Sequence, residues 1–288
     1  MPKTAYTLTH PEHRTTSVVF ASPHSGRDYP WSFVRRTALN EHSVRSSEDA
    51  FVDELYDTAP RYGAPFIKAG APRAYVDLNR SVEELDPALI EGVRKSGHNP
   101  RVASGLGVIP RVVANGQAIY SGKLTLQEAQ RRIDTYWRPY HETLKTELDK
   151  AHREFGQAIL IDCHSMPHEA MDSIAKTGVQ RPDVVLGDRF GAAADEEIVD
   201  QIEAAFREAG LVVTRNTPFA GAFITQNYGR PSDKRHAIQI EIDRSLYMNE
   251  QLVRPNANFS DFKRRLEGVV ADIAAIGRPK VARPLAAE

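Results

Sequence analysis

The feature that most limits the fold of this sequence is the alternation of short apolar runs with amphipathic helical patterns along most of the chain. The runs that we expect to be strands are 17–22, 64–69, 74–79, 157–164, 183–187, 211–216 and 237–243. The helical patterns cover 46–56, 125–155, 193–209 and 260–276. Strands that alternate with helices predict an α/β protein, a three-layer α/β/α arrangement around a mixed, mostly parallel central sheet.

Local signals at helix ends support these ranges. Ser46 or Ser47 can cap the first helix, and Thr125 with Glu128 forms a capping box for the long one. Pro139 lies inside the long pattern and is expected to kink or divide it. We find no repeat or linker, so we predict a single domain over residues 1–277 and an extended or disordered tail over 278–288.

Charge and composition exclude several classes of function. The chain has 288 residues with 37 basic and 38 acidic side chains, a formal net charge of -1, which argues against nucleic-acid binding and polybasic membrane binding. No apolar stretch is long enough to span a membrane, and the N-terminus lacks the apolar region of a secretory signal. A single cysteine excludes an internal disulfide and a cysteine-rich zinc site. We therefore expect a cytoplasmic protein, whose oligomeric state the sequence leaves open, a monomer included.

Polar side chains stand at the ends of several apolar runs. His24 follows 17–22, the 74–79 run leads into Arg80, and His164 closes 157–164. In open α/β sheets, ligands bind beyond the carboxyl ends of the strands. These positions therefore predict the functional site, although a single histidine at a strand end is more often a hydrogen-bonded structural residue.

Two histidines and a carboxylate form the usual protein ligand set of a catalytic zinc. His24 and His164 are the candidate imidazoles, and Asp49 is the candidate carboxylate, with Glu48 as the alternative. Acidic residues in a first helical turn also stabilise the helix dipole without any other function. The spacing alone leaves both readings of Asp49 open.

Glu241 lies within an apolar run, where an unpaired carboxylate is costly. Its structural explanation is an ion pair with Arg244, and its functional one is a general base for a metal-activated water. Arg73 and Arg80 have the chemistry to bind a carboxylate or a developing oxyanion, although most arginines lie at surfaces or in packing contacts.

Several segments together resemble the N-formylglutamate amidohydrolase family. They are SPHSG…YP (22–30), EDAFVDELY (48–56), YVDLNRS (75–81), DCHSMP (162–167), VLGDRFG (185–191), TPFAGAFITQNYGRP (217–231) and QIEIDRSLYM (239–248). The family is similar to zinc carboxypeptidases and aspartoacylases. The resemblance implies a phosphorylase/hydrolase-like fold, a divalent metal (usually Zn2+), and hydrolysis of N-formyl-L-glutamate to formate and glutamate during histidine degradation.

The resemblance also implies roles for individual residues. The segment 73–80 is similar to the aspartoacylase pattern, in which an Asn-Arg pair, here Asn79 and Arg80, binds a substrate carboxylate and an upstream arginine, here Arg73, stabilises the oxyanion. The carboxypeptidase His-x-x-Glu motif is absent, because Arg27 stands three residues after His24. Asp49 is then the best match for the acidic ligand. Further pocket residues in matching segments are Arg189, Thr225, Asn227 and Arg230.

Two other catalytic mechanisms fit the sequence less well. A Cys163 nucleophile acting with His164 fails, because adjacent strand residues point to opposite faces. No G-x-S-x-G motif of a serine hydrolase is present. A deacylase of another N-acyl amino acid and a non-catalytic binding protein on the same scaffold remain as alternatives.

Overall fold

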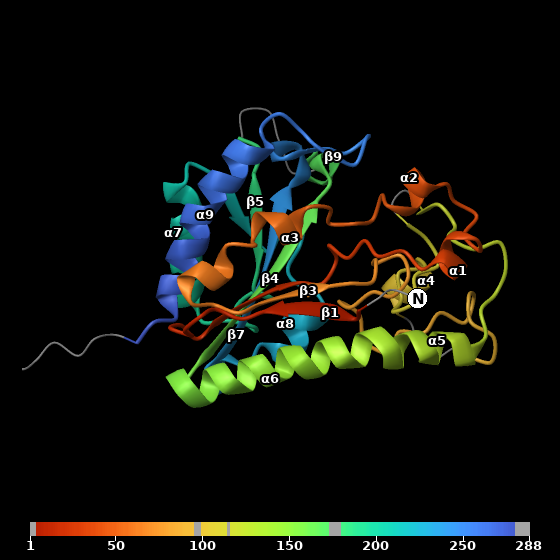
Figure 1. The fold of residues 1–288 in the computed structure, drawn as a ribbon, viewed down its shortest axis with the longest axis horizontal. Coiled ribbons are helices and arrows are strands. Elements are labelled where there is room, and N and C mark those ends of the chain that lie inside the picture. Colours follow the sequence, from red (N-terminus) through yellow and green to blue (C-terminus); the bar gives the residue numbers. More distant parts are fainter. Residues whose placement is uncertain (1–3, 95–98, 114–115, 173–179, 280–288) are drawn as a thin grey trace, which may run out of the picture.

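The computed structural model describes residues 4–94, 99–113, 116–172 and 180–279, and its centre is a seven-stranded mixed sheet (Figure 1). In spatial order the strands are β1 (Tyr6–Thr9), β3 (Phe66–Ala69), β2 (Val18–Ser22), β4 (Ala158–Met166), β7 (Arg235–Asp243), β5 (Val184–Gly187) and β6 (Val213–Arg215). β1 pairs antiparallel with β3 and β5 antiparallel with β7, while the other neighbours are parallel. The predicted mixed, mostly parallel sheet is confirmed.

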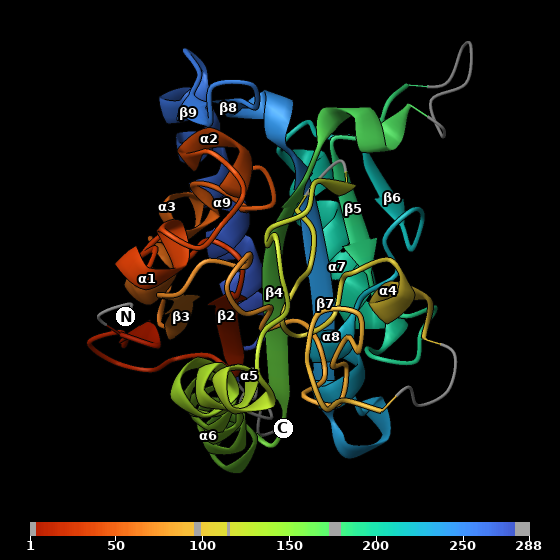
Figure 2. The same cartoon turned by 90° about the vertical axis from the view of Figure 1, so that its right-hand side faces the viewer.

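Helices cover both faces of this sheet. The α6 helix contacts β2 and β4 from one side, and α9 and α7 cover the other side (Figures 1 and 2). The helices are α1 (Trp31–Val34), α2 (Glu41–Val44), α3 (Val52–Leu55), α4 (Pro100–Ala103), α5 (Leu126–Arg132), η3 (Ile133–Trp137, a π-helical turn), α6 (Arg138–Phe155), α7 (Glu196–Glu208), α8 (Phe223–Tyr228) and α9 (Phe259–Ile276). Short 3-10 turns are η1 (Ala59–Tyr62), η4 (His168–Met171), η5 (Pro231–Asp233) and η6 (Arg244–Leu246), and β8 (Met248–Asn249) pairs with β9 (Arg254–Pro255). Among the described helices, none combines the length and apolar character that a membrane crossing needs.

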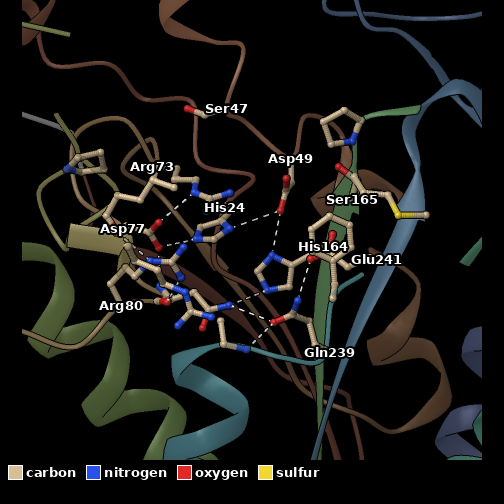
Figure 3. A pocket seen from close by; sticks show the side chains of 18 of the residues that line it. His24, Ser47, Asp49, Arg73, Asp77, Arg80, His164, Ser165, Gln239 and Glu241 are labelled. Carbon is tan, nitrogen blue, oxygen red and sulfur yellow. Dashed lines mark hydrogen bonds and ion pairs between the residues drawn. The ribbon is translucent and has the colours of Figure 1, made fainter. Parts of the chain in front are cut away.

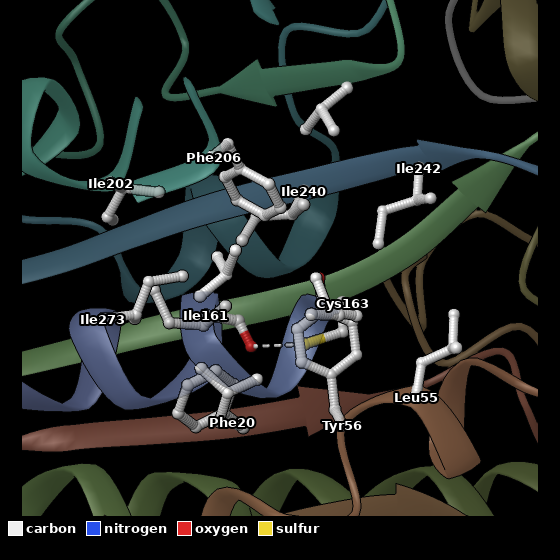
Figure 4. Close-up of a cluster of buried hydrophobic side chains, with 14 of the residues drawn as sticks. Phe20, Leu55, Tyr56, Ile161, Cys163, Ile202, Phe206, Ile240, Ile242 and Ile273 are labelled. Carbon is white, nitrogen blue, oxygen red and sulfur yellow. Dashed lines mark hydrogen bonds between the residues drawn. The ribbon is translucent and has the colours of Figure 1, made fainter. Parts of the chain in front are cut away.

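The alternation of side chains along β4 explains where the core ends and the site begins. Ile159, Ile161 and Cys163 point into the core beneath α7 and α9, where they pack with residues such as Phe206 (Figure 4). On the opposite face Leu160 belongs to the core beneath α6. The next residues on that face, Asp162 and His164, are polar although buried. The sheet is therefore apolar on both faces at one end and polar on one face at its carboxyl end.

The long helical pattern at 125–155 is divided, as predicted, close to Pro139. Thr125 caps α5 by accepting a hydrogen bond from the Glu128 N–H at 3.2 Å. The division is a π-helical turn, and the Arg138 N–H donates to the Ile133 carbonyl. Proline has no N–H to donate to the preceding turn and therefore does not fit the hydrogen-bond pattern of a regular α-helix. A wider helical turn at this place avoids part of that misfit.

The predicted helix at 46–56 is wrong for its first half. Only α3 is helical, and Phe51 before it takes a left-handed backbone conformation with φ 67°. The Asp49 N–H donates to the His24 carbonyl at 3.0 Å instead of to a helical partner. Asp49 therefore does not lie in a first helical turn, and the helix-dipole explanation for it no longer applies.

The predicted strand at 74–79 is also wrong. Tyr75 and Val76 both donate to the Pro72 carbonyl, and the Asp77 carboxylate accepts the N–H of Asn79 at 2.8 Å. These turns leave no extended run for a neighbouring strand, and the segment is a buried loop. Conversely, β1 was not predicted. The C-terminal tail from 280 onwards lies outside the described residues.

Candidate metal and active site

A cavity of about 600 Å³ opens at the carboxyl ends of β2, β4 and β7. His24 lies just after β2, His164 lies on β4, and Glu241 lies on β7 directly opposite His164 in the strand register. The cavity is also lined by Asp49 and by the 73–80 loop. Three adjacent parallel strands thus bring together residues that are far apart in the sequence.

His24, Asp49 and His164 form a buried group that could hold a metal ion. One candidate ligand atom from each residue lies within 4.8 Å of the others, and Figure 3 shows the three side chains turned toward one another. Asp49 Oδ2 lies 2.9 Å from His164 Nδ1 and 3.5 Å from His24 Nδ1. Ligand atoms around one zinc, each about 2.0–2.2 Å from the ion, lie roughly this far apart.

Neighbouring carboxylates decide which nitrogen of each imidazole is available. Asp77 Oδ1 lies 2.7 Å from His24 Nε2, and Asp162 Oδ2 lies 3.0 Å from His164 Nε2. A carboxylate accepts hydrogen bonds, so each Nε2 carries a proton and each Nδ1 faces Asp49. His24 Nδ1 is buried and has no hydrogen-bond partner among the described residues, so its lone pair is available to a metal ion.

The charges around this group favour a cation at its centre. Burial alone would raise the pKa of Asp49, but its interactions with the His164 and His24 imidazoles hold that pKa well below its usual range. At His164, burial alone would lower the pKa, but Asp162 and Asp49 raise it well above its ordinary value. Arg244 donates to Asp49 Oδ1 at 2.9 Å, which leaves Oδ2 directed at the histidines.

Glu241 is buried beside this group (Figure 3). The Gln239 amide donates to its Oε1 at 2.8 Å. Burial is the main cause that raises the pKa of Glu241 to about 7, a value suited to proton transfer near neutral pH. The alternative ion pair with Arg244 is not formed, because Arg244 pairs with Asp49.

Four residues of the 73–80 loop line the cavity. Arg73 Nε donates to Asp77 Oδ2 at 3.0 Å, and Arg80 donates to the carbonyls of Asn79 and Leu106 at 2.7 and 3.0 Å. The Asn79 amide lies 3.2 Å from His164 Nε2, and its oxygen accepts the Ile224 N–H at 2.7 Å. Asn79 therefore links the loop, β4 and α8 while it lines the cavity.

The remaining predicted pocket residues lie elsewhere. The described residues that line this cavity do not include Arg189, Thr225, Asn227 or Arg230. Asn227 and Arg230 line two neighbouring cavities, and the Thr225 hydroxyl is used inside α8, where it donates to the Ala222 carbonyl. The backbone of Arg189 lies in a turn with φ 57°.

Side chains of the α5–η3–α6 helix hold the 73–80 loop by its backbone. Arg132 donates to the Tyr75 carbonyl at 3.1 Å, and Trp137 donates to the Arg80 carbonyl at 2.9 Å. His141 contacts the Leu78 carbonyl at 2.8 Å. Side chains five residues apart do not share a face of a regular α-helix, but the π-helical turn brings Arg132 and Trp137 to the same side. We call these three residues the helix brace.

Several site residues were not assigned a function from the sequence. Asp77 and Asp162 stood out as polar residues near strand ends, but nothing indicated that each would orient a histidine. The sequence suggested Arg244 as an ion-pair partner of Glu241 or Asp243, and not of Asp49. Cys163 is buried in the core on the far face from His164, and burial raises the pKa of its thiol well above the usual range, which agrees with its exclusion as a nucleophile.

Comparison with known proteins agrees with this geometry. The model of the N-formylglutamate amidohydrolase family matches residues 16–248, which include every residue of the buried group and Glu241. The chain belongs to the N-formylglutamate amidohydrolase family. It is therefore an amide-hydrolysing enzyme of the hydrolase class.

Similar proteins cover most of the chain. An N-formylglutamate deformylase of Pseudomonas putida is 30% identical over 81% of this chain and 82% of its own length. An N-formylglutamate deformylase of Pseudomonas aeruginosa is 29% identical over 82% of this chain and 83% of its own length. The crystal structure of N-formylglutamate amidohydrolase from Ralstonia eutropha JMP134 has a TM-score of 0.88 at 36% identity, over 94% of this chain and 98% of that one. A gene product of Agrobacterium tumefaciens, at 16% identity and a TM-score of 0.64, shares the fold.

Proposed function

We propose that this protein hydrolyses the amide bond of N-formyl-L-glutamate to give formate and L-glutamate, with a divalent metal, Zn2+ in particular, at His24, Asp49 and His164. The observation that carries the proposal is the buried group of two imidazoles and one carboxylate beside Glu241. Family membership and the names of the similar enzymes support the substrate.

The ligands in this proposal are Nδ1 of His24, Nδ1 of His164 and Oδ2 of Asp49. When bound, a divalent metal supplies Lewis-acid activation of a water molecule and of the scissile carbonyl near neutral pH. Asp77 and Asp162 fix the ring orientations through the opposite nitrogens, and Arg244 fixes the carboxylate. Such outer partners normally strengthen metal binding.

Glu241 acts as the general base and then as the general acid. Its carboxylate accepts a proton from the attacking water as the oxygen bonds to the formyl carbon. It then delivers this proton to the amide nitrogen, which leaves as the amine of glutamate when the C–N bond breaks. The hydrogen bond from Gln239 to one carboxylate oxygen holds the side chain in a single orientation.

Arg73 and Arg80 act on the charges of the substrate. The Arg73 guanidinium stabilises the negative charge that develops on the formyl oxygen. Arg80, with Asn79 beside it, binds a carboxylate of the substrate by charge-assisted hydrogen bonds. Arg189 and Arg230, which are not among the described residues that line this cavity, remain proposals as more distant substrate contacts.

A turnover panel tests the proposal. Purified, zinc-supplemented protein is incubated with N-formyl-L-glutamate, N-acetyl-L-glutamate and N-acetyl-L-aspartate, and formate or acetate release is measured with amine release. We expect equal amounts of formate and glutamate, and much slower release from both acetyl substrates. Faster turnover of an acetyl substrate would favour another deacylase, and no turnover of N-formyl-L-glutamate would contradict the proposed substrate.

A further inference from the structure

The cavity carries two arginines that form no ion pair with a described carboxylate. Arg73 pairs with Asp77, and Arg244 pairs with Asp49. Arg80 and Arg101 also line the cavity, but neither forms an ion pair within the described part of the chain. Among the residues outside that part, the sequence contains one carboxylic side chain, Glu288.

The two unpaired guanidiniums influence each other. Burial, with the nearby positive charges of Arg73 and Arg101, lowers the pKa of Arg80, and the negative charges of Asp77 and Glu84 offset this only in part. Both oxygens of Asp77 are already taken, by His24 at 2.7 Å and by Arg73 at 3.0 Å. Two like charges on one cavity wall are unfavourable unless an anion lies between or beside them.

The backbone holds Arg101 in a fixed place relative to Arg80. Asn99 caps the short α4 helix by accepting the N–H groups of Arg101 and Val102 at 3.0 and 3.3 Å. The Leu106 N–H donates to the Arg101 carbonyl at 2.8 Å, and the Leu106 carbonyl accepts Arg80 Nε at 3.0 Å. The segment 101–106 therefore connects the two arginines directly.

N-formyl-L-glutamate has two carboxylates, and both are ionised at neutral pH. The α-carboxylate is one bond from the carbon that bears the scissile amide, so it must lie near the reacting centre. Arg80 is buried and follows Asn79, which contacts His164. Arg101 is exposed at the edge of the same cavity. The more distant side-chain carboxylate therefore matches Arg101.

We infer that Arg101 binds the side-chain carboxylate of the substrate, while Arg80 binds the α-carboxylate, so that Arg101 determines specificity for acidic N-formyl amino acids. The inference rests on the proposed function. It assigns no part in the chemical step to Arg101, and it predicts an effect that depends on the charge of the substrate side chain.

The test compares N-formyl-L-glutamate with N-formyl-L-glutamine, which has nearly the same shape but a neutral side chain. We expect Arg101→Met to lower kcat/KM for the glutamate substrate by about 10–100-fold, mainly through KM, and to change kcat/KM for the glutamine substrate by less than about threefold. Arg101→Lys should restore part of the discrimination. Arg264→Met, which removes the same charge from the exposed side of α9, is the matched control and should change neither.

The outcomes separate the inference from the proposed function. An equal loss of kcat/KM for both substrates in Arg101→Met, or no loss for either, would overturn the assignment of Arg101 while deformylase activity stands. If the unaltered protein hydrolysed neither substrate under conditions where its metal content is verified, the proposed function would fail, and the assignment with it.

Discussion

Two sides of the cavity are held in place by different kinds of structure. One side carries His24, Asp49, His164 and Glu241, and the other carries Arg73, Arg80 and Arg101. On the first, which we call the strand-end side, ladder hydrogen bonds between β4 and β7 position His164 and Glu241, and His24 lies just after β2. On the second, the loop side, the 73–80 segment has no strand partner and is held by side chains of the helix brace.

This difference has consequences for function. A sheet in a buried core resists local distortion, so the strand-end side is suited to the metal and to proton transfer, which require fixed geometry. Substrate-binding side chains on loops vary more easily without loss of the fold. Changes on the strand-end side should therefore affect kcat and metal binding. Changes on the loop side should affect KM and substrate choice, except at Arg73, which acts on the developing oxyanion and should also affect kcat.

The largest expected effect is at Glu241. Replacement by glutamine keeps the size of the side chain but removes its basicity, so we expect kcat to fall by about 10²–10⁴-fold, with KM and metal content little changed. Steady-state kinetics with metal analysis measure this. The control is Glu197→Gln on the exposed side of α7, which should be neutral. Retained turnover in Glu241→Gln would show that another group is the base.

The second prediction concerns the support of the metal group. Arg244→Met removes the donor to Asp49 Oδ1, so we expect zinc affinity to fall by about 10–100-fold, as for other outer partners of metal ligands. Competition with a chromogenic chelator measures the affinity, and Arg264→Met again serves as the control. Unchanged affinity would mean that Asp49 is not the metal ligand, or that Arg244 does not orient it.

A smaller effect is expected for the helix brace. Trp137→Phe removes the hydrogen bond to the Arg80 carbonyl, worth about 1 kcal/mol, so KM for N-formyl-L-glutamate should rise by about 3–10-fold while kcat changes little. The chain offers a matched control in Trp31→Phe, because Trp31 is 72% exposed. A fall in kcat without a change in KM would contradict the division between the two sides.

A separate effect, on stability and not on catalysis, is a pH dependence at His141. Burial lowers the pKa of His141 to about 4, below the value of about 6.5 in the unfolded chain. Because the folded state resists protonation, this residue contributes stability that is complete above about pH 6.5 and is lost as the pH falls toward 4, on the order of 2–3 kcal/mol. Denaturation at pH 7 and pH 4.5 should show a smaller difference for His141→Gln than for the unaltered protein. An identical difference would mean that His141 is protonated with little cost.

Much of the strand-end side could be predicted from the sequence. Short apolar runs identified β2, β4 and β7, and polar residues at the ends of these runs or within them identified His24, His164 and Glu241. The ligand role of Asp49 and the other site assignments remain predictions that these experiments test. The structure removes one competing explanation, because Asp49 does not begin a helix.

The loop side was harder to predict for physical reasons. The apolar residues at 74–78 are buried, but they are buried in turns, and a short apolar run does not distinguish a buried loop from a strand. The helix brace depends on a π-helical turn that no spacing rule anticipates. Arg101 lies in a four-residue helix without apolar periodicity, and only the fold brings it beside Arg80.

The most direct test of the central claim is a metal titration of activity. Protein is stripped with a chelator, its metal content is verified, and formate release from N-formyl-L-glutamate is followed as Zn2+ is added back. We predict that the stripped protein is inactive and that activity rises in proportion to bound zinc until one equivalent fills the group at His24, Asp49 and His164. Full activity in protein verified to be metal-free would contradict the account.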